Sequence, residues 1–434
     1  MDADPQPTTP APRPAVSMRT MLQAVGPGIL LAGAAIGASH LIQSTRAGAG
    51  FGFGMLAVLL VACITKYPFL EFGPRYAASA HEDLVEGYRR LGKWAVWLCA
   101  IVNFGSMFII MAALTVVSAA IAQFLLGVYF PDSGSITPQT LSAIIITVCL
   151  LILLLGKYRT LERTMKIVMT VLLLSTLAAV AIALTKSSPR TIPDDTPPWW
   201  GNANFAFLLA FMGWMPIPID SAVWNSIWVQ EHQRIHQRQA NLREAIFDFR
   251  FGYILAGLVA ILFLALGALV MHGRVDELQD GAGFVQQLIG TYAETLGRWS
   301  IPLIAIAALT TMLSTTLVVL DAFPRAMHRL TQAIRDTDPH EDTKQRGYAF
   351  WVVLQALVAM GIILFSLKSM KTMVDLATTL SFLTAPILAL INYLVITRHA
   401  PTNARPGPGM RVWSIASIVF LTAFSAAYLV WRFV

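Results

Sequence analysis

Residues 205–224 read FAFLLAFMGWMPIPIDSAVW, a strongly apolar stretch that two prolines interrupt near its middle. An apolar stretch of about 20 residues is long enough to cross a lipid bilayer as a helix. Pro216 and Pro218 each lack a backbone N–H donor, and the ring of each clashes with the preceding helical turn. A helix that enters this segment therefore cannot continue through it unbroken.

A second apolar stretch, residues 26–50, is interrupted in a different way. It reads GPGILLAGAAIGASHLIQSTRAGAG, and the small residues Gly37, Ala38 and Ser39 join an apolar half to a polar half. Small residues let the backbone unwind at such a point. Non-helical backbone at membrane depth is tolerated only where protein or a water-filled cavity surrounds it, so we expect the two breaks to face each other across a polar site. Interrupted segments in corresponding positions of two halves point to a transporter with inverted repeats.

The composition excludes several classes of protein. Of the 434 residues, 56% are apolar and only 13% are charged, which rules out an ordinary soluble globular protein. The 3 cysteines each lie within an apolar run, so we expect neither a disulfide framework nor a CxxC-type metal site. The sequence contains no P-loop, nucleophile elbow or zinc-ligand motif, so we predict that the protein is neither an enzyme nor an ATP-driven pump.

Eleven apolar runs are long enough to span a membrane, and polar or Pro/Gly-rich joints separate them. The sequence therefore predicts an all-α integral membrane protein with a disordered tail at residues 1–17, a transporter core at 18–397 and an added C-terminal helix at 398–434. The expected spans are 26–46, 50–73, 94–127, 138–156, 160–185, 203–230, 246–272, 300–324, 348–367, 372–397 and 412–433.

The basic residues predict the orientation of the chain. The net charge of +7 could indicate a nucleic-acid partner, but in a membrane protein the position of each basic residue matters more than their sum. With the N-terminus in the cytoplasm, most of the 31 Lys and Arg residues fall on the inner side, as the positive-inside rule requires. We therefore expect a protein of the cytoplasmic membrane, surrounded by lipid, with its C-terminus outside and no nucleic-acid partner.

Several short motifs resemble the NRAMP family of proton-coupled divalent-metal transporters, and the match extends over roughly the whole membrane region. They are GPG at 26–28, AGAGFGFG at 47–54, LER at 161–163, Met215-Pro216 and Ser314-Thr315. The resemblance implies a LeuT-like fold, in which residues 18–185 and 203–397 form a 5+5 inverted repeat with broken helices 1 and 6. It also implies alternating access around a site between these two helices.

The chain departs from the family in the motif that supplies metal ligands from the first span. Where the family has Asp-Pro-Gly-Asn, with the Asp and the Asn as ligands, this chain has Gly37, Ala38, Ser39 and His40. Manganese and iron(II) bind oxygen or nitrogen donors, and a carboxylate offsets the charge of a dehydrated dication. Because no carboxylate is expected at this site, transition metals are poor substrates for it.

Other family motifs are altered as well. The Met-Pro-His motif of the sixth span keeps Met215 and Pro216 but has Ile217 in place of the His. The third span, over residues 94–126, contains none of the acidic residues that the family usually places on its proton route. Thr384 stands where the family has a glutamine two residues before the tenth-span proline.

The remaining features of the predicted site favour an anion. The second half of a broken helix directs backbone N–H groups and the positive end of its dipole toward the site, where Ser39 and His40 add two hydrogen-bond donors. Arg46, less than two turns further along, adds positive potential. We therefore predict a secondary transporter of a small anion, with bicarbonate as the first choice. A divalent-metal transporter with an unconventional site and a non-transporting receptor or scaffold are the alternatives.

The predicted site residues form three groups. Those expected to bind the substrate are Gly37, Ala38, Ser39, His40, Met212, Gly213, Met215, Pro216 and Thr384. Those expected to bind a coupling ion are Ser314 and Thr315. Those with a possible role in a gate or in the electrostatics are Arg46, Lys66, Asp220 and Asp321.

The predicted site residues also lead to expectations about the coupling ion, the gate and the partners. In relatives with the LeuT-like fold, hydroxyls of the eighth helix help to hold sodium, so sodium is one candidate ion, and a proton carried by His40 or by an acid is the other. Lys66 lies near Glu71 and Arg75 in the sequence, so it could form a salt-bridged inner gate or a structural ion pair. We expect no organic cofactor, no resident metal and a monomeric protein.

Overall fold

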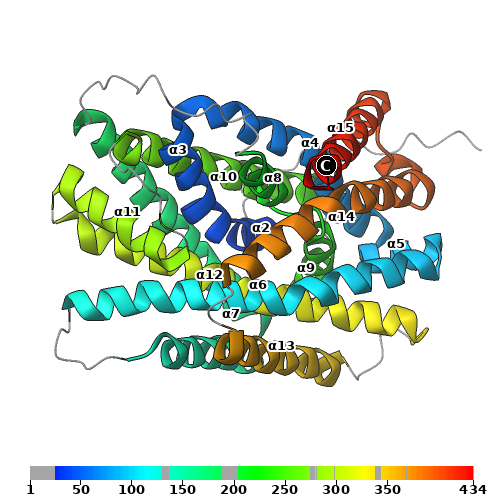
Figure 1. Ribbon diagram of the computed structural model, residues 1–434. Coiled ribbons are helices and arrows are strands. Elements are labelled where there is room, and N and C mark those ends of the chain that lie inside the picture. Colours follow the sequence, from blue (N-terminus) through cyan, green and yellow to red (C-terminus); the bar gives the residue numbers. More distant parts are fainter. Residues whose placement is uncertain are drawn as a thin grey trace, which may run out of the picture.

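The computed structural model describes residues 25–129, 136–186, 204–239, 241–273, 279, 281–297, 299–337, 344–366 and 370–433. The regular elements in these ranges are all helices (Figure 1). Nine stretches in the described residues are long and apolar enough to cross a membrane, namely Ser39–Ala80, Lys93–Gly127, Pro138–Leu155, Arg159–Thr185, Leu242–Met271, Ala307–Ile334, Arg346–Phe365, Thr378–Arg398 and Pro408–Trp431. The two predicted spans without a stretch of their own are the first and the sixth, and both are divided.

The first predicted span is broken where the small residues lie. Helix α2 (Pro27–Ala35) ends before Ile36, and the chain becomes helical again in a π-helix, η1 (Ser39–Ser44). The helix continues as α3 (Thr45–Phe51), and a short 3-10 turn, η2 (Gly52–Gly54), leads into α4 (Met55–Ala80). The predicted break at Gly37-Ala38-Ser39 is therefore present, although the helix already ends one residue earlier.

The sixth predicted span is broken at its prolines. Helix α8 (Phe205–Trp214) has 10 residues and ends before Met215, which has an extended backbone. The chain becomes helical again in α9 (Ser221–His236), so the segment between the two helices contains both Pro216 and Pro218. The predicted effect of the two prolines is observed.

The remaining elements agree with the predicted spans. They are α6 (Lys93–Tyr129), α7 (Pro138–Lys186), which contains two spans, α10 (Leu242–Leu266) with η4 (Gly267–Met271), α12 (Ser300–Ile334), α13 (Lys344–Ser366), α14 (Met370–Arg398) and α15 (Pro408–Phe433). A short 3-10 turn, η6 (Thr402–Ala404), lies between the last two. Two further helices, α5 (Leu84–Leu91) and α11 (Gly281–Leu296), were not predicted, because both are too short to cross a bilayer. The predicted tail at residues 1–17 lies outside the described residues.

Long helices surround the two broken ones. Figure 1 shows α6 and α12 crossing the molecule next to each other, with α13 packed against both, while α2, α8 and α9 lie toward the middle. The Ser118 and Thr316 hydroxyls, 3.1 Å apart, join α6 to α12. This arrangement encloses the breaks of α2–η1 and α8–α9 in protein, as non-helical backbone in a membrane requires.

Helix α10 packs closely against both halves of the broken first helix. A Cβ atom at Gly28 of α2 or at Gly252 of α10 would overlap the backbone of the facing helix. At the other end of α10 the same holds for Gly48 of α3 and Gly267 of η4. Glycine at these positions therefore allows direct backbone contact, which larger residues would prevent.

The carboxylate of Asp248, in α10, holds the start of α2. It accepts hydrogen bonds from the backbone N–H groups of Gly26 at 2.9 Å and Gly28 at 2.7 Å. The first N–H groups of a helix have no partner within the helix, so this side chain satisfies two groups that would otherwise be buried without one.

Candidate functional site

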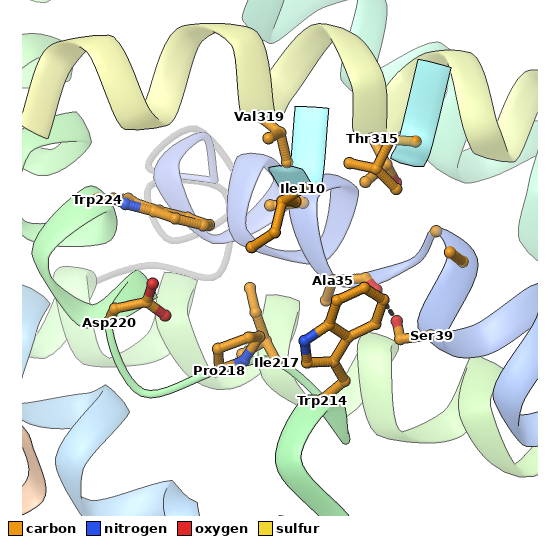
Figure 2. A pocket seen from close by; sticks show the side chains of 14 residues that line it. Ala35, Ser39, Ile110, Trp214, Ile217, Pro218, Asp220, Trp224, Thr315 and Val319 are labelled. Carbon is orange, nitrogen blue, oxygen red and sulfur yellow. Dashed lines mark hydrogen bonds between the residues drawn. The ribbon is translucent and has the colours of Figure 1, made fainter. Parts of the chain in front are cut away.

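A small cavity lies between the two helix breaks, in the position that the sequence predicts (Figure 2). Its volume is about 50 Å³. The walls come from the first broken helix, α6, the sixth broken helix and α12, and the lining residues are Ala34, Ala35, Gly37, Ala38, Ser39, Ile110, Leu114, Trp214, Ile217, Pro218, Asp220, Trp224, Thr315 and Val319. Most of these side chains are apolar, so the few polar atoms determine what the cavity can bind.

The carbonyl oxygens at the end of α2 already have hydrogen-bond donors. The Ser39 hydroxyl donates to the carbonyl of Ala35 at 2.7 Å, a bond drawn in Figure 2. The Thr315 hydroxyl, from α12, lies 2.9 Å from the carbonyl oxygen of Gly33 and 2.8 Å from that of Ile36. The free carbonyl oxygens at a helix end bind cations in many transporters. Here the hydroxyl groups of Ser39 and Thr315 donate hydrogen bonds to carbonyl oxygens at this end.

Thr315 also explains why residue 37 is a glycine. A Cβ atom at Gly37 would lie 2.5 Å from Oγ1 and 2.7 Å from Cγ2 of Thr315. These distances are far shorter than ordinary van der Waals contacts, so Thr315 occupies the volume that a side chain at position 37 would need. The position where the family has a metal-binding Asp is therefore filled by a hydroxyl and a methyl group.

A buried lysine donates hydrogen bonds to carbonyl oxygens at the second break. The ammonium group of Lys66, in α4, donates to the carbonyl oxygen of Gly213 at 2.6 Å and to that of Ile217 at 3.4 Å. Lys66 is only 1% exposed, and Ile217 lines the cavity. The ammonium group thus places positive charge directly behind the cavity wall and uses the acceptors at the end of α8.

Lys66 is not part of the salt-bridged gate that its neighbours in the sequence suggested. In the described structure the carboxylate of Glu71 pairs with Arg75 and Arg250 and accepts a hydrogen bond from the Tyr67 hydroxyl. This cluster connects α4 to α10, whereas the Lys66 ammonium group faces α8. Glu71, Arg75, Arg250 and Tyr67 thus form the ionic cluster, and Lys66 lies behind the cavity wall.

Asp220 corrects the expectation that the site has no carboxylate. It lines the cavity, and its side chain does not cap α9, which begins at the next residue. Its Oδ1 atom is buried and has no hydrogen-bond partner among the described residues. Figure 2 shows this carboxylate pointing toward Trp224. A carboxylate oxygen that is buried without a hydrogen-bond partner in a mostly apolar wall is unfavourable, so Oδ1 is the natural place for a proton or a ligand.

The wall of the cavity contains two indole groups. The Nε1 atoms of Trp214 and Trp224 are buried without a partner among the described residues, and both residues line the cavity. In Figure 2 the indole nitrogen of Trp214 lies on the side of Ile217 and Pro218. Figure 2 draws the Trp224 nitrogen at the end of its ring farthest from these residues. Buried indole N–H groups nearly always have an acceptor, so the Trp214 donor indicates a ligand that accepts hydrogen bonds.

His40 lies beside the cavity rather than in its wall. Its Nδ1 atom is 2.9 Å from the Ser39 hydroxyl, and its Nε2 atom is 3.0 Å from the carbonyl oxygen of Ala256 in α10. The ring is 0% exposed and is directed away from the cavity. His40 therefore positions Ser39, which does line the cavity.

Two of the backbone donors expected from the second half of the broken helix already have acceptors. The N–H groups of His40 and Leu41 both donate to the carbonyl oxygen of Gly37, at 3.1 and 2.9 Å. The donors of the site are thus side chains and not these backbone groups.

The other residues predicted to bind the substrate do not line the cavity. The Met215 sulfur accepts a hydrogen bond from the Ser44 hydroxyl at 3.4 Å, and Met212 belongs to the same apolar cluster as Met215. The Thr384 hydroxyl donates to the carbonyl of Leu380 at 2.8 Å, within its own helix. Their place in substrate binding stays a prediction, and the contacts do not support it.

The remaining predicted residues have structural partners. Arg46 lies over the rings of Phe207 and Phe284, each 5.9 Å from its guanidinium carbon. The Ser314 hydroxyl donates to the Thr311 carbonyl at 2.7 Å. The carboxylate of Asp321 accepts hydrogen bonds outside the cavity, from Trp228 at 3.0 Å, Arg325 at 2.7 Å and Tyr348 at 2.6 Å.

Sequence reasoning missed one whole wall of the cavity. Ile110 and Leu114 project from α6, and Val319 comes from α12. Their spacing places Ile110 and Leu114 on the same helix face, but an all-apolar helix gives no sign of which face meets a ligand. Trp224 was missed for a similar reason, because nothing in the sequence separates it from Trp228, which hydrogen-bonds to Asp321.

The fold and the cavity between two broken helices define a membrane-embedded secondary transporter of the LeuT-like class. The family model of natural resistance-associated macrophage protein-like (Nramp) sequences matches residues 28–432. The chain therefore belongs to the Nramp family. An uncharacterized protein of Pasteurella multocida (strain Pm70) is 34% identical over 413 residues, which cover 94% of this chain and 92% of that protein.

Solved structures confirm the predicted fold class. Crystal structures of an Eremococcus coleocola manganese transporter superpose with a TM-score of 0.69, at 16% identity, over 96% of this chain and 88% of that one. MhsT in complex with L-phenylalanine gives 0.63, at 14% identity, over 92% and 98% of the two chains. Mhp1, a nucleobase-cation-symport-1 family transporter, gives 0.61, at 16% identity, over 93% and 87%. Nramp proteins are transporters, which agrees with the expectation that this integral membrane protein is not an enzyme.

Proposed function

We propose that this protein transports a small anion, with bicarbonate as the best candidate, by alternating access around the cavity. One observation carries the proposal: Ser39, Thr315 and Lys66 donate hydrogen bonds to carbonyl oxygens at the two helix breaks, and the buried indole N–H group of Trp214 has no acceptor among the described residues. A dication needs several oxygen ligands, whereas an anion needs donors and positive potential. The Lys66 ammonium group, behind Ile217, supplies that potential.

The size of the cavity supports a compact substrate. At about 50 Å³ the cavity is small, which favours a substrate of few atoms. Bicarbonate has four non-hydrogen atoms. A fully hydrated magnesium ion or an amino acid with a large side chain would not fit in this conformation.

Asp220 is the proposed proton carrier. An ionised Asp220 would repel an anion in the same cavity, whereas a protonated carboxyl group could donate a hydrogen bond to it. Binding of the anion and of a proton would then favour each other, which couples the two. Sodium is the second candidate coupling ion, because the Thr315 hydroxyl lies near two carbonyl oxygens and can donate its one proton to only one of them at a time.

A divalent cation is the second candidate substrate. The unpaired Oδ1 atom of Asp220 favours it, since a buried carboxylate is a preferred ligand of manganese and magnesium. The Nramp structures that resemble this chain are of a manganese transporter. Against it stands the Lys66 ammonium group, whose charge would repel a second cation behind the same wall.

Uptake into liposomes tests the two candidates directly. Liposomes with the purified protein should accumulate radiolabelled bicarbonate faster than protein-free liposomes, and an inward proton gradient should increase the rate. Mn²⁺ or Mg²⁺ uptake monitored with a fluorescent indicator should stay at the level of the protein-free control. Substantial Mn²⁺ uptake without bicarbonate uptake would favour the second candidate, and uptake of neither would favour a receptor or scaffold.

Asp220→Asn separates the roles of this residue. If Asp220 carries the coupling proton, the variant should still exchange bicarbonate across the membrane but should no longer respond to a proton gradient, because an amide cannot be ionised. If Asp220 is a cation ligand, the variant should lose cation uptake. An unchanged response to the gradient would exclude Asp220 as the proton carrier.

We expect Ser39→Ala to lower bicarbonate uptake by about two- to tenfold, because the carbonyl oxygen of Ala35 loses its hydroxyl donor and would face the anion. This range corresponds to one lost hydrogen bond of roughly 0.5–1.5 kcal/mol. His40→Ala should act in the same direction through the position of Ser39. Ser414→Ala is the matched control, because that hydroxyl lies in α15 and donates only within its own helix, to Met410 at 2.7 Å. Normal uptake by both Ser39→Ala and His40→Ala would place the substrate elsewhere.

A further inference from the structure

Three potential metal ligands meet far from the cavity, where α9 ends. Glu162 of α7 and His232 and His236 of α9 place one ligand atom each within 4.8 Å of one another. The Oε2 atom of Glu162 lies 3.3 Å from Nδ1 of His232 and 3.6 Å from Nε2 of His236. The two histidines are four residues apart, so they lie on the same face of one helix.

The distances fit a tetrahedral ion of the zinc type. Zinc binds His nitrogen and carboxylate oxygen at about 2.0–2.2 Å, so neighbouring ligand atoms in a tetrahedral site lie roughly 3.3–3.5 Å apart. Both measured distances to Oε2 are close to this value. Two imidazoles and one carboxylate are a common ligand set for such ions, and they leave a fourth position for water.

Charge and access also suit a metal ion. Lys166 binds the other carboxylate oxygen, Oε1, at 2.7 Å, which orients Glu162 so that Oε2 faces the histidines. Lys166 reduces the negative charge of the site, but its side chain is 42% exposed and its charge is screened by water. The side chain of His236 is 40% exposed, so an ion in solution can reach the ligands.

We infer that Glu162, His232 and His236 form a binding site for a zinc-like transition-metal ion, separate from the transport cavity. The separation follows from helix geometry: Asp220 precedes α9, and 12 residues later His232 lies about 18 Å further along the axis. The site also contacts the start of α2. A Cβ atom at Gly26 would lie 2.9 Å from the His232 ring and 3.0 Å from Oε1 of Glu162.

A metal ion at this position would bind helices that we expect to move during transport. An ion bound to both α7 and α9 would fasten these helices together beside the first residues of α2. If the N-terminus lies in the cytoplasm, as the basic residues predict, the site faces the cytoplasm and responds to metal there. The bound ion should therefore slow transport by limiting the movement of α7 relative to α9.

Cobalt and zinc binding test the site without any transport assay. The detergent-purified full-length protein, made without a polyhistidine tag, should bind one Co²⁺ with the visible absorption bands of tetrahedral coordination, and Zn²⁺ should displace it. His232→Gln, His236→Gln and Glu162→Gln should each weaken Zn²⁺ binding by at least about tenfold in calorimetry, since loss of even an outer partner of a metal ligand has an effect of that size. His399→Gln, a half-buried histidine outside the cluster, should bind as the wild type does.

Zn²⁺ binding by the variants and the effect of Zn²⁺ on uptake are judged separately. His236→Gln changes a partly exposed side chain, so it should keep the elution profile and melting temperature of the metal-free protein even if Glu162→Gln does not fold. Zn²⁺-binding constants that are equal in the wild type and all three variants would overturn the inference, whichever substrate the protein carries. Zn²⁺ should also slow uptake of the transported ion in the wild type and not in His236→Gln, and equal inhibition of both would exclude the effect on transport.

Discussion

Lys66→Met is expected to lower bicarbonate uptake by about ten- to a hundredfold. Methionine has a similar length and no charge, so the variant removes the ammonium group and leaves the carbonyl oxygens of Gly213 and Ile217 without their donor. Hydrogen bonds to charged groups are worth roughly 1.5–3 kcal/mol, and every 1.4 kcal/mol is about a factor of ten. The anion would also lose the positive charge behind the cavity wall.

A second lysine, Lys93, provides the control for the effect of Lys66→Met on uptake. Lys93→Met makes the same chemical change at the surface, where Lys93 pairs with Asp336 at 2.7 Å and is 64% exposed. An exposed pair of this kind contributes little, so we expect uptake close to that of the wild type. Equal uptake by Lys66→Met and Lys93→Met, in liposomes with equal amounts of folded protein, would contradict the role of Lys66. Mn²⁺ binding gained by Lys66→Met would support it, because two carbonyl oxygens become available.

Gly37→Asp is expected to abolish uptake on its own and to create a cation site only together with Thr315→Gly. In the single variant the new Cβ atom would overlap Thr315, and overpacking of this kind costs about 1–3 kcal/mol. Removing the Thr315 side chain clears that volume and frees the carbonyl oxygens of Gly33 and Ile36. The double variant would then have a carboxylate and two free carbonyls at one helix break.

The melting temperatures and uptake rates of the two single variants and the double variant test this prediction. Gly37→Asp should lower the melting temperature more than Thr315→Gly does, and the double variant should be more stable than the sum of the two single effects predicts. The double variant should take up Mn²⁺ and lose bicarbonate uptake. A stable Gly37→Asp variant with normal bicarbonate uptake would show that Thr315 does not exclude a side chain there.

The helix breaks could be predicted from the sequence because local chemistry causes them. Pro216 and Pro218 cannot be accommodated in a continuous helix, and the structure ends α8 before them. Apolar length predicted the long spans equally well, since the lipid bilayer sets a minimum length for a helix that crosses it. By contrast α11, an amphipathic helix of 16 residues, could not be found by span length.

Side-chain directions could not be predicted in the same way. His40 occupies a position that matches a family ligand, yet its ring binds the carbonyl of Ala256 in a helix more than 200 residues away. Lys66 looked like a partner of Glu71 in sequence, but the helical turn directs the two side chains to different neighbours. Both outcomes depend on which helices pack together, and one sequence does not contain that information.

The glycine contacts of α10 imply that both halves of the first helix are held against the same partner. Gly48 and Gly267 bring α3 and η4 into direct backbone contact, and Gly28 and Gly252 do the same for α2 and α10. Asp248, which accepts hydrogen bonds from the N–H groups of Gly26 and Gly28, adds two polar bonds at the start of α2. If the two halves move relative to each other about Ile36–Ala38, either α10 must move together with α2 or the contact between Gly28 and Gly252 must open.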